Sequence, residues 1–281
     1  MASSTQRLDH LRGDIDTIDV ALHELIVKRA TIVEEIRKIK NGAGPVLRPG
    51  REAAILRRLA ADHKGGFPLP ALMSVWREMI SAFSHMQEPF SAAVYAPAGH
   101  ERVAGLARSQ YGSQTPISHS ATPSAAVRAV SEGAATIAIL PMPAEGEEDA
   151  WWPMLIGSDK TPRVITRLPF LADGRGEEAL VLGAFDRDLS ADEATLVAVE
   201  LTERASRSKI VSVLSTDPLK GAVPVASTDT KSGRNFHLIQ VPGVVANGDK
   251  KLAVLGERLG PIFVQAHVVG GYALPLKAAT V

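Results

Sequence analysis

Residues 8–40 read LDHLRGDIDTIDVALHELIVKRATIVEEIRKIK and decide the fold of the first part of the chain. Apolar residues recur there at spacings of three and four, which is typical of one face of a long α-helix. The seam contains Leu8, Leu11, Ile15, Ile18, Leu22, Leu25, Ile32, Ile36 and Ile39, with Arg29 in the same register. A helix that ends at Lys40 is about 50 Å long and cannot bury its whole seam against two short partners from one chain. The pattern therefore predicts a homodimer built on this helix.

Two shorter helices are expected to follow the long one. The segment Gly42-Ala-Gly-Pro45 ends the first helix, and Arg51-Glu52 opens a second one. A third helix starts at about Leu69 and ends before Pro89, because proline disfavours helical geometry at the residue before it. We therefore expect a helical domain over residues 1–89.

Composition excludes several classes of protein. The 281 residues include 31 Lys+Arg and 31 Asp+Glu, and zero net charge argues against a nucleic-acid binder. Cysteine is absent, which excludes disulfides, zinc ribbons, iron–sulfur clusters and thiol nucleophiles. The eight histidines lack metal-ligand spacing, so we expect neither metal nor cofactor. No apolar run approaches the ~20 residues of a membrane span, and the first residues lack an apolar signal core, so we expect a cytoplasmic protein without membrane contact.

Arg29 occupies a seam position where an aliphatic residue is expected. A buried arginine without a partner is costly, so it meets a bound anion, pairs with an acidic residue, or extends its head to the surface. Lys40 follows about three turns later on the same helix face. Arg12 lies about 25 Å from Arg29 along the axis, so only the Arg12 of a second, antiparallel chain can approach Arg29.

Polar residues on the other two helices extend this set. Arg51 and Glu52 begin the second helix, and Gln87 lies on the apolar face of the third, although a residue so near a helix end can also face water. Several cations with one carboxylate, one amide and no nucleophile–base pair suit a small dianion better than covalent or hydrolytic chemistry.

A known family shares this arrangement of residues. Its pattern here is Leu11-Arg12, Asp19, Lys28-Arg29, Lys38-Ile39-Lys40, Arg51-Glu52 and Gln87. Over about residues 5–88 the chain resembles the all-helical class of chorismate mutases, which are intertwined dimers of three-helix chains. The resemblance implies that chorismate is converted to prephenate by a (3,3) pericyclic rearrangement. By this resemblance, the enzyme would hold the compact conformer of the substrate and stabilise the charge that builds on the breaking ether oxygen.

The resemblance also implies a role for each polar residue. The substrate-binding residues would be Arg12 of the partner subunit, Arg29, Lys40, Arg51, Glu52 and Gln87. The arginines would bind the substrate carboxylates, and Glu52 would accept a hydrogen bond from the ring hydroxyl. The catalytic residues would be Lys40, Gln87 and Arg29. Because Lys40 and Gln87 would donate to the ether oxygen, which is more negative in the transition state, Lys40 is expected to matter most for turnover.

Two positions depart from the family pattern. The segment Arg48-Pro49-Gly50 stands where many members carry an Asp or another polar residue, and Phe83 occupies a position that is commonly small and polar. Two alternatives therefore stay open. One is isochorismate-pyruvate lyase on the same fold, and the other is a non-catalytic regulatory or binding protein of aromatic amino-acid biosynthesis.

Residues 90–176 resemble one shortened α/β lobe of prephenate dehydratase. The matching pieces are an opening strand with a glycine turn at 93–99, a helix at 125–133 and a strand at 135–141. Segments His100-Glu-Arg-Val and Met142-Pro-Ala-Glu replace the family's Thr-Phe-Ser and Glu-Asn-Ser, and a second lobe has no room. We therefore expect no dehydratase activity.

Residues 177–281 resemble an ACT-type α+β module. Strands are expected at 179–183, 195–201, 236–243 and 270–275, with a helix at Leu252–Leu259. The module's glycine turn is replaced by Glu203-Arg-Ala-Ser-Arg-Ser208, so close approach of an amino acid to the backbone is not favoured. The partners that remain open are an aromatic amino-acid effector and another shikimate-pathway enzyme. The expected fold class is therefore multi-domain: a helical dimer-forming domain, then a mixed α/β region that ends in the ACT-like module.

Overall fold

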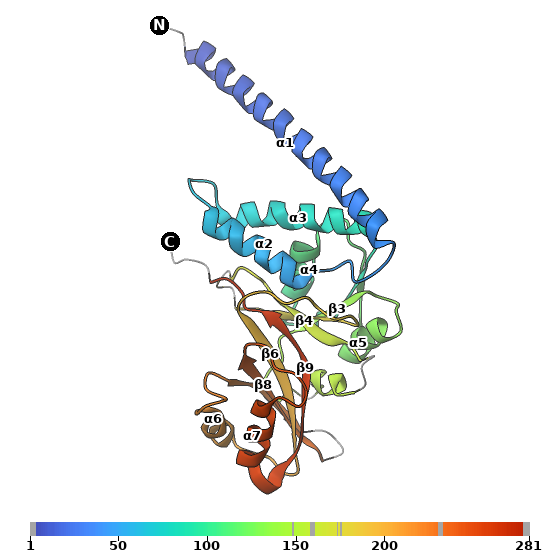
Figure 1. The fold of residues 1–281 in the computed structure, drawn as a ribbon, viewed down its shortest axis with the longest axis vertical. Helices are drawn as coiled ribbons and strands as arrows, with labels where there is room; N and C mark the ends of the chain where they lie inside the picture. The colour runs from blue at the N-terminus through green and yellow to red at the C-terminus, as the bar shows by residue number, and fades with distance from the viewer. Residues whose placement is uncertain are drawn as a thin grey trace. The chain divides into compact units, whose positions relative to one another are not determined.

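The computed structural model describes residues 4–147, 149–157, 161–172, 174, 176–229 and 233–277. Three helices, α1 (Ser4–Lys40), α2 (Pro49–Asp62) and α3 (Leu69–Gln87), precede a mixed α/β region (Figure 1). This confirms the predicted fold class, a helical N-terminal region followed by α/β structure. No helix in the described ranges is long and apolar enough to cross a membrane.

The chain separates into two compact units. One unit holds residues 1–46 and 82–89, and the other holds residues 47–81 and 90–281. This division differs from the expected boundaries at 89/90 and 176/177. The reason is that α2 and the first part of α3 share a core with the sheet region: Ala53, Leu56 and Met73 pack with Phe170 and Ala273.

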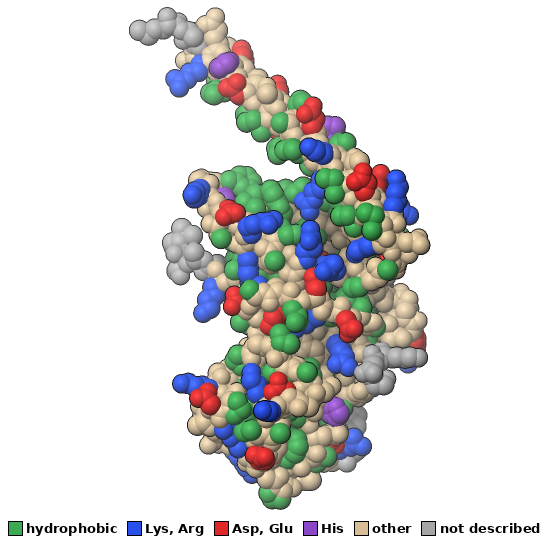
Figure 2. Space-filling model, in the orientation of Figure 1, with side chains coloured by type: hydrophobic (Ala, Val, Ile, Leu, Met, Phe, Trp, Pro, Cys, Tyr) green, Lys and Arg blue, Asp and Glu red, His purple; other side chains and the backbone are tan. Residues whose placement is uncertain are grey.

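The first unit consists mainly of α1, which is one uninterrupted helix of 37 residues (Figure 1). Val33 is its one buried side chain. The predicted seam is exposed along the helix, and its apolar residues lie between charged side chains on the surface (Figure 2). The sequence pattern thus correctly predicts the helix, and the single chain leaves its apolar face open to water.

The second unit contains a nine-stranded sheet formed by the described residues, with the strand order β2-β1-β3-β5-β4-β9-β6-β8-β7. The strands are β1 (Ala92–Val94), β2 (Ile117–His119), β3 (Ile137–Pro141), β4 (Arg163–Leu168), β5 (Ala179–Gly183), β6 (Glu193–Leu201), β7 (Val223–Asp229), β8 (Asn235–Pro242) and β9 (Phe263–Ala273). The connecting helices are α4 (Arg102–Tyr111), α5 (Pro123–Ser131), α6 (Arg207–Leu214) and α7 (Lys250–Leu259).

Strand β5 lies in a different part of the sheet from the one expected. It is antiparallel to both β3 and β4, so it belongs with the strands of residues 90–176 rather than with the later ones. The remaining elements run β6-α6-β7-β8-α7-β9 with the strand order β9-β6-β8-β7, the arrangement of a split β-α-β fold. At the junction, Gly270 of β9 pairs with Val164 of β4, and a Cβ at Gly270 would overlap the Val164 carbonyl oxygen.

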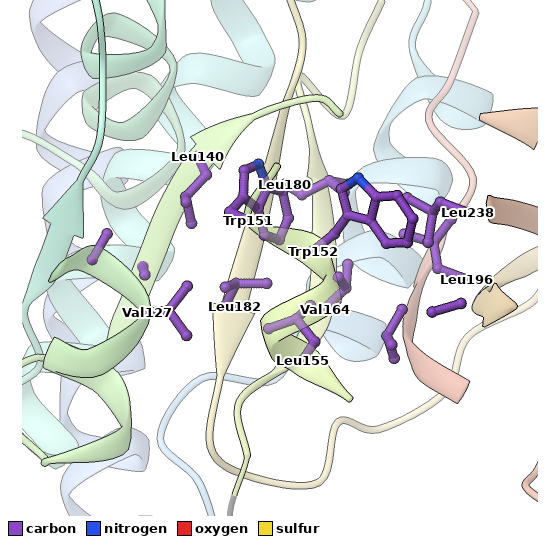
Figure 3. Close-up of a cluster of buried hydrophobic side chains, with 14 of the residues drawn as sticks. Val127, Leu140, Trp151, Trp152, Leu155, Val164, Leu180, Leu182, Leu196 and Leu238 are labelled. Carbon is purple, nitrogen blue, oxygen red and sulfur yellow. The ribbon is translucent and has the colours of Figure 1, made fainter. Parts of the chain in front are cut away.

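Both faces of the sheet are covered. Helices α6 and α7 pack on one face, against Val197, Val199 and Val241. The other face carries Leu196 and Leu238 together with Trp151 and Trp152, which the close-up shows among Leu155, Val164 and Leu180 (Figure 3). Every residue of β6 is buried, and its apolar side chains divide between the two cores: Ala194, Leu196 and Ala198 enter one, and Val197, Val199 and Leu201 enter the other.

Candidate active site

Arg29 contacts an aromatic ring. Its guanidinium carbon lies 4.7 Å from the centre of the Phe83 ring, and Phe83 itself is only 7% exposed. Helix α1 supplies the arginine and the last turns of α3 supply the ring. A guanidinium over an aromatic face is attracted by the negative face of the ring. The seam arginine is therefore held by Phe83, one of the two positions that depart from the family pattern.

Gln87 also contacts Phe83. Its side-chain Nε2 donates a hydrogen bond of 3.3 Å to the Phe83 main-chain oxygen. Gln87 lines a hollow of about 660 Å³ together with Glu34, Arg37, Lys38, Asn41, Gly42 and Glu88. The hollow is open and carries both signs of charge. Of its lining residues on α1, Lys38 belongs to the family pattern, whereas Glu34 and Arg37 were not singled out from the sequence. Arg29 and Gln87 thus both contact Phe83, the first at its ring and the second at its main-chain oxygen.

The other two predicted residues of this unit lie at opposite ends of α1. Lys40 is the last residue of the helix and is half-buried. Arg12 is exposed, and its Nη1 lies 3.2 Å from the Asp9 carboxylate one turn earlier. Within one chain Arg12 is too far along the helix to approach Arg29, as the rise per residue requires.

Arg51 and Glu52 lie in the second unit, in the first turn of α2. The residue that precedes this helix, Arg48, provides no side-chain cap. The cap comes instead from Asp188, in the loop between β5 and β6. Its carboxylate accepts hydrogen bonds of 3.0 Å from the main-chain N–H groups of both Gly50 and Arg51, and of 3.1 Å from Arg48 Nε.

Glu52 lies among buried polar groups. Burial raises the pKa of Glu52 to about 7, while the positive charge of Arg77 on α3 acts in the opposite direction. Gln110 of α4 donates to the Glu52 carboxylate at 3.5 Å. Burial likewise lowers the pKa of Arg77 and raises that of Tyr111. Glu52 therefore readily takes up a proton near neutral pH.

Three of these polar residues were not singled out from the sequence. Arg77 falls among buried residues of α3 at helical spacing, with Met73 and Ser81, so a count of polar residues on that stripe could have indicated it. Gln110 and Asp188 had no such signal, because their contacts join segments 58 and 137 residues apart.

The helical segment matches a known family. Residues 11–88 match the family chorismate mutase type II. This match confirms the resemblance to chorismate mutases that was predicted for the N-terminal part of the chain from Arg12, Arg29, Lys40 and the Arg51-Glu52 pair.

Curated relatives share the same segment. The chain is 35% identical over 99 residues to the bifunctional chorismate mutase/prephenate dehydratase of Neisseria gonorrhoeae (strain ATCC 700825 / FA 1090), a match that covers 34% of this chain and 27% of the relative. It is 33% identical over 97 residues to the enzyme of the same name from Aquifex aeolicus (strain VF5), covering 33% of this chain and 27% of the relative. The match thus spans about a quarter of each relative's length.

A solved structure shows a lower likeness over more of the chain. Prephenate dehydratase from Streptococcus mutans is 17% identical, and the match covers 67% of this chain and 100% of that one with a TM-score of 0.44.

Proposed function

We propose that this protein is a chorismate mutase that converts chorismate to prephenate by a (3,3) pericyclic rearrangement. One observation carries the proposal: the segment that matches the family holds Arg12, Arg29, Lys40, Arg51 and Glu52 at the spacing expected of its substrate-binding residues. The reaction moves no proton and forms no covalent enzyme intermediate, so a set of cations without a nucleophile is sufficient for it.

The proposed roles follow the charges of the substrate. Arg29, Arg51 and Arg12 of the partner subunit bind its two carboxylates, and bidentate arginine contacts favour the compact conformer. Glu52 accepts a hydrogen bond from the ring hydroxyl of the substrate. Lys40 and Gln87 donate to the ether oxygen, whose negative charge is larger in the transition state than in the ground state, so these contacts raise turnover.

We also propose that the working form is a homodimer. The seam residues Leu11, Ile15, Ile18, Leu22 and Leu25 are 49–63% exposed on α1. A row of exposed aliphatic residues at heptad spacing is the surface that a second helix of the same kind buries. An antiparallel copy of α1 would also supply the missing Arg12.

The test is to mix the purified protein with chorismate and follow the loss of chorismate absorbance. Rapid loss with formation of prephenate supports the proposal. No loss, with a folded dimer verified in the same sample, overturns it. Running the assay with phenylalanine or tyrosine asks whether the ACT-like residues 177–281 respond to an aromatic amino acid.

Two other functions make different predictions in the same assay. An isochorismate-pyruvate lyase on this fold would release pyruvate from isochorismate. A non-catalytic binding protein would bind a substrate analogue without turnover, and the departures from the family pattern at Arg48 and Phe83 are the observations that favour it. For residues 90–176 we propose a structural role without dehydratase activity.

A further inference from the structure

The N-terminus of helix α2 has no capping hydrogen bond from the side chain at its own N-cap position. Its first turn contains Pro49 and Gly50, neither of which has a polar side chain, and Arg48 before them makes no side-chain cap. The first amides of a helix lack partners within the helix, so they need an acceptor from elsewhere. An acceptor with negative charge is the most favourable, because the helix dipole places partial positive charge at this end.

Asp188 supplies that acceptor from a distant part of the chain. One carboxylate oxygen accepts from the Gly50 amide, and the other accepts from the Arg51 amide and from Arg48 Nε. The approach is close enough to require glycine: a Cβ at Gly50 would lie 2.5 Å from the Asp188 main-chain oxygen. The loop and the helix start therefore fit each other at both side-chain and main-chain level.

The loop that carries Asp188 is itself fixed on the sheet. Glu193, the first residue of β6, is buried and accepts hydrogen bonds from the Ser190 amide at 2.7 Å and from the Ser190 hydroxyl at 3.0 Å. From the helix side, Arg57 of α2 donates to Ser190 Oγ at 2.8 Å and to the Leu274 carbonyl at 2.9 Å. Contacts from two successive parts of α2 thus meet one anchored loop.

We propose that Asp188 is a positioning residue, which holds the first turn of α2 and with it the chorismate-binding residues Arg51 and Glu52. This inference rests on the proposed mutase function for its catalytic part. It gives residues 177–281 a direct role in the mutase reaction, because a loop of that region fixes the side chains that bind the substrate.

The experiment uses the full chain and four variants. Asp188→Ala removes the carboxylate, and Asp188→Asn keeps the size and one acceptor oxygen. Asp186→Ala is the matched control, since Asp186 is an exposed residue of the same loop. The double variant Arg48→Asp with Asp188→Ala places a carboxylate at the helix's own capping position. Two quantities are measured: hydrogen exchange of the amides in residues 47–56, and kcat and KM for chorismate.

We expect faster exchange at Gly50 and Arg51 in Asp188→Ala, with KM raised about fivefold and kcat changed less than twofold, the size of effect that loss of a helix cap produces. The exchange rates and KM of Asp188→Asn should fall between those of Asp188→Ala and the wild type. If Asp188→Ala does not fold, Asp188→Asn therefore still provides a measurable test. Asp186→Ala should match the wild type, and the double variant should recover both quantities.

Three outcomes decide the question. If exchange at Gly50 and Arg51 is the same in Asp188→Ala and Asp186→Ala, Asp188 does not hold the helix and the inference is wrong. If exchange rises but KM stays unchanged, the contact is structural only and the positioning role is wrong. If the wild type does not turn over chorismate, the proposed function fails, and the exchange comparison still decides whether Asp188 holds α2.

Discussion

The guanidinium carbon of Arg29 lies 4.7 Å from the centre of the Phe83 ring, within one compact unit. The negative face of an aromatic ring attracts a guanidinium cation held over it. The ring therefore helps to fix the position of the arginine. In this arrangement Phe83, although it departs from the family pattern, acts as a support for the proposed substrate-binding arginine.

Phe83→Leu should weaken substrate binding. Leucine keeps most of the apolar volume but removes the ring face, which contributes about 0.5–2 kcal/mol to holding a cation. We expect KM for chorismate to rise about threefold to tenfold, with a smaller change in kcat, in steady-state kinetics. Phe67→Leu is the control, because Phe67 is 56% exposed. An unchanged or lower KM would mean that the ring does not support Arg29 or hinders its access to the substrate.

Lys40→Ala should lower kcat far more than it raises KM. If Lys40 donates to the ether oxygen, its contact strengthens as negative charge builds there in the transition state. Removing one such donor typically costs a factor of about 100–1,000 in kcat. The control is Lys64→Ala, an exposed lysine after α2. A variant with full kcat and a raised KM would show that Lys40 binds the ground state only, and the proposed role at the ether oxygen would have to be withdrawn.

The sequence predicts most of the helical fold because its signals there are local. The seam from Leu8 to Ile39, the glycines after Lys40 and Pro89 each act over a few residues, and the observed helices end where these residues place the ends. Short apolar runs also indicated strands β1, β3, β5, β6, β8 and β9, whereas β2, β4 and β7 were not predicted. The order of the strands in the sheet could not be predicted, because the pairing of β5 with β3 and β4 depends on contacts between segments that are distant in sequence.

The candidate site likewise contains residues that local signals indicate and contacts that depend on distant segments. Arg29 and Lys40 were indicated by register within one helix. The surroundings of Glu52 could not be predicted, since the groups that affect its protonation, Arg77, Gln110 and Asp188, come from α3, α4 and the β5–β6 loop. A local pattern identifies which residues carry charge, and tertiary packing determines the pKa of each.

The homodimer makes a prediction about α1. Ile18→Glu places a charge in the middle of the exposed seam, where a second helix would bury it, so the dimer should dissociate at micromolar concentration. Light scattering after size-exclusion chromatography measures the change as a halved mass. The control is Val20→Glu, which introduces the same charge on the opposite face of the helix at a residue of similar exposure, 59% against 58%.

If Ile18→Glu and the control have the same mass, the seam is not the dimer interface. Activity gives a second measure of the same prediction. A monomer lacks Arg12 of the partner subunit, so loss of the dimer should raise KM for chorismate. Mixing Ile18→Glu with an excess of wild type should restore part of the activity as mixed dimers form.

The raised pKa of Glu52 predicts how stability depends on pH. The groups that face this carboxyl are Arg77, Gln110 and Tyr111 from α3 and α4, with Asp188 and the Arg48 main chain at the start of α2. Burial outweighs the attraction of Arg77, and the pKa rises from an ordinary 4.5 to about 7. Between these two values the folded chain keeps a proton that the unfolded chain has released.

The free energy of unfolding should therefore fall as pH rises through this window, because the stabilisation is complete below pH 4.5 and is lost as pH passes 7. A shift of this size corresponds to about 3 kcal/mol. Glu52→Gln has no ionisable group at this position. Its free energy of unfolding, relative to that of the wild type, should therefore increase by that amount from pH 5 to pH 8 when both are measured by urea unfolding. Glu35→Gln, at an exposed position of α1, is the control for the loss of one carboxylate. Parallel curves for Glu52→Gln and the wild type would mean that Glu52 is ionised throughout, and that solvent or Arg77 compensates for its burial.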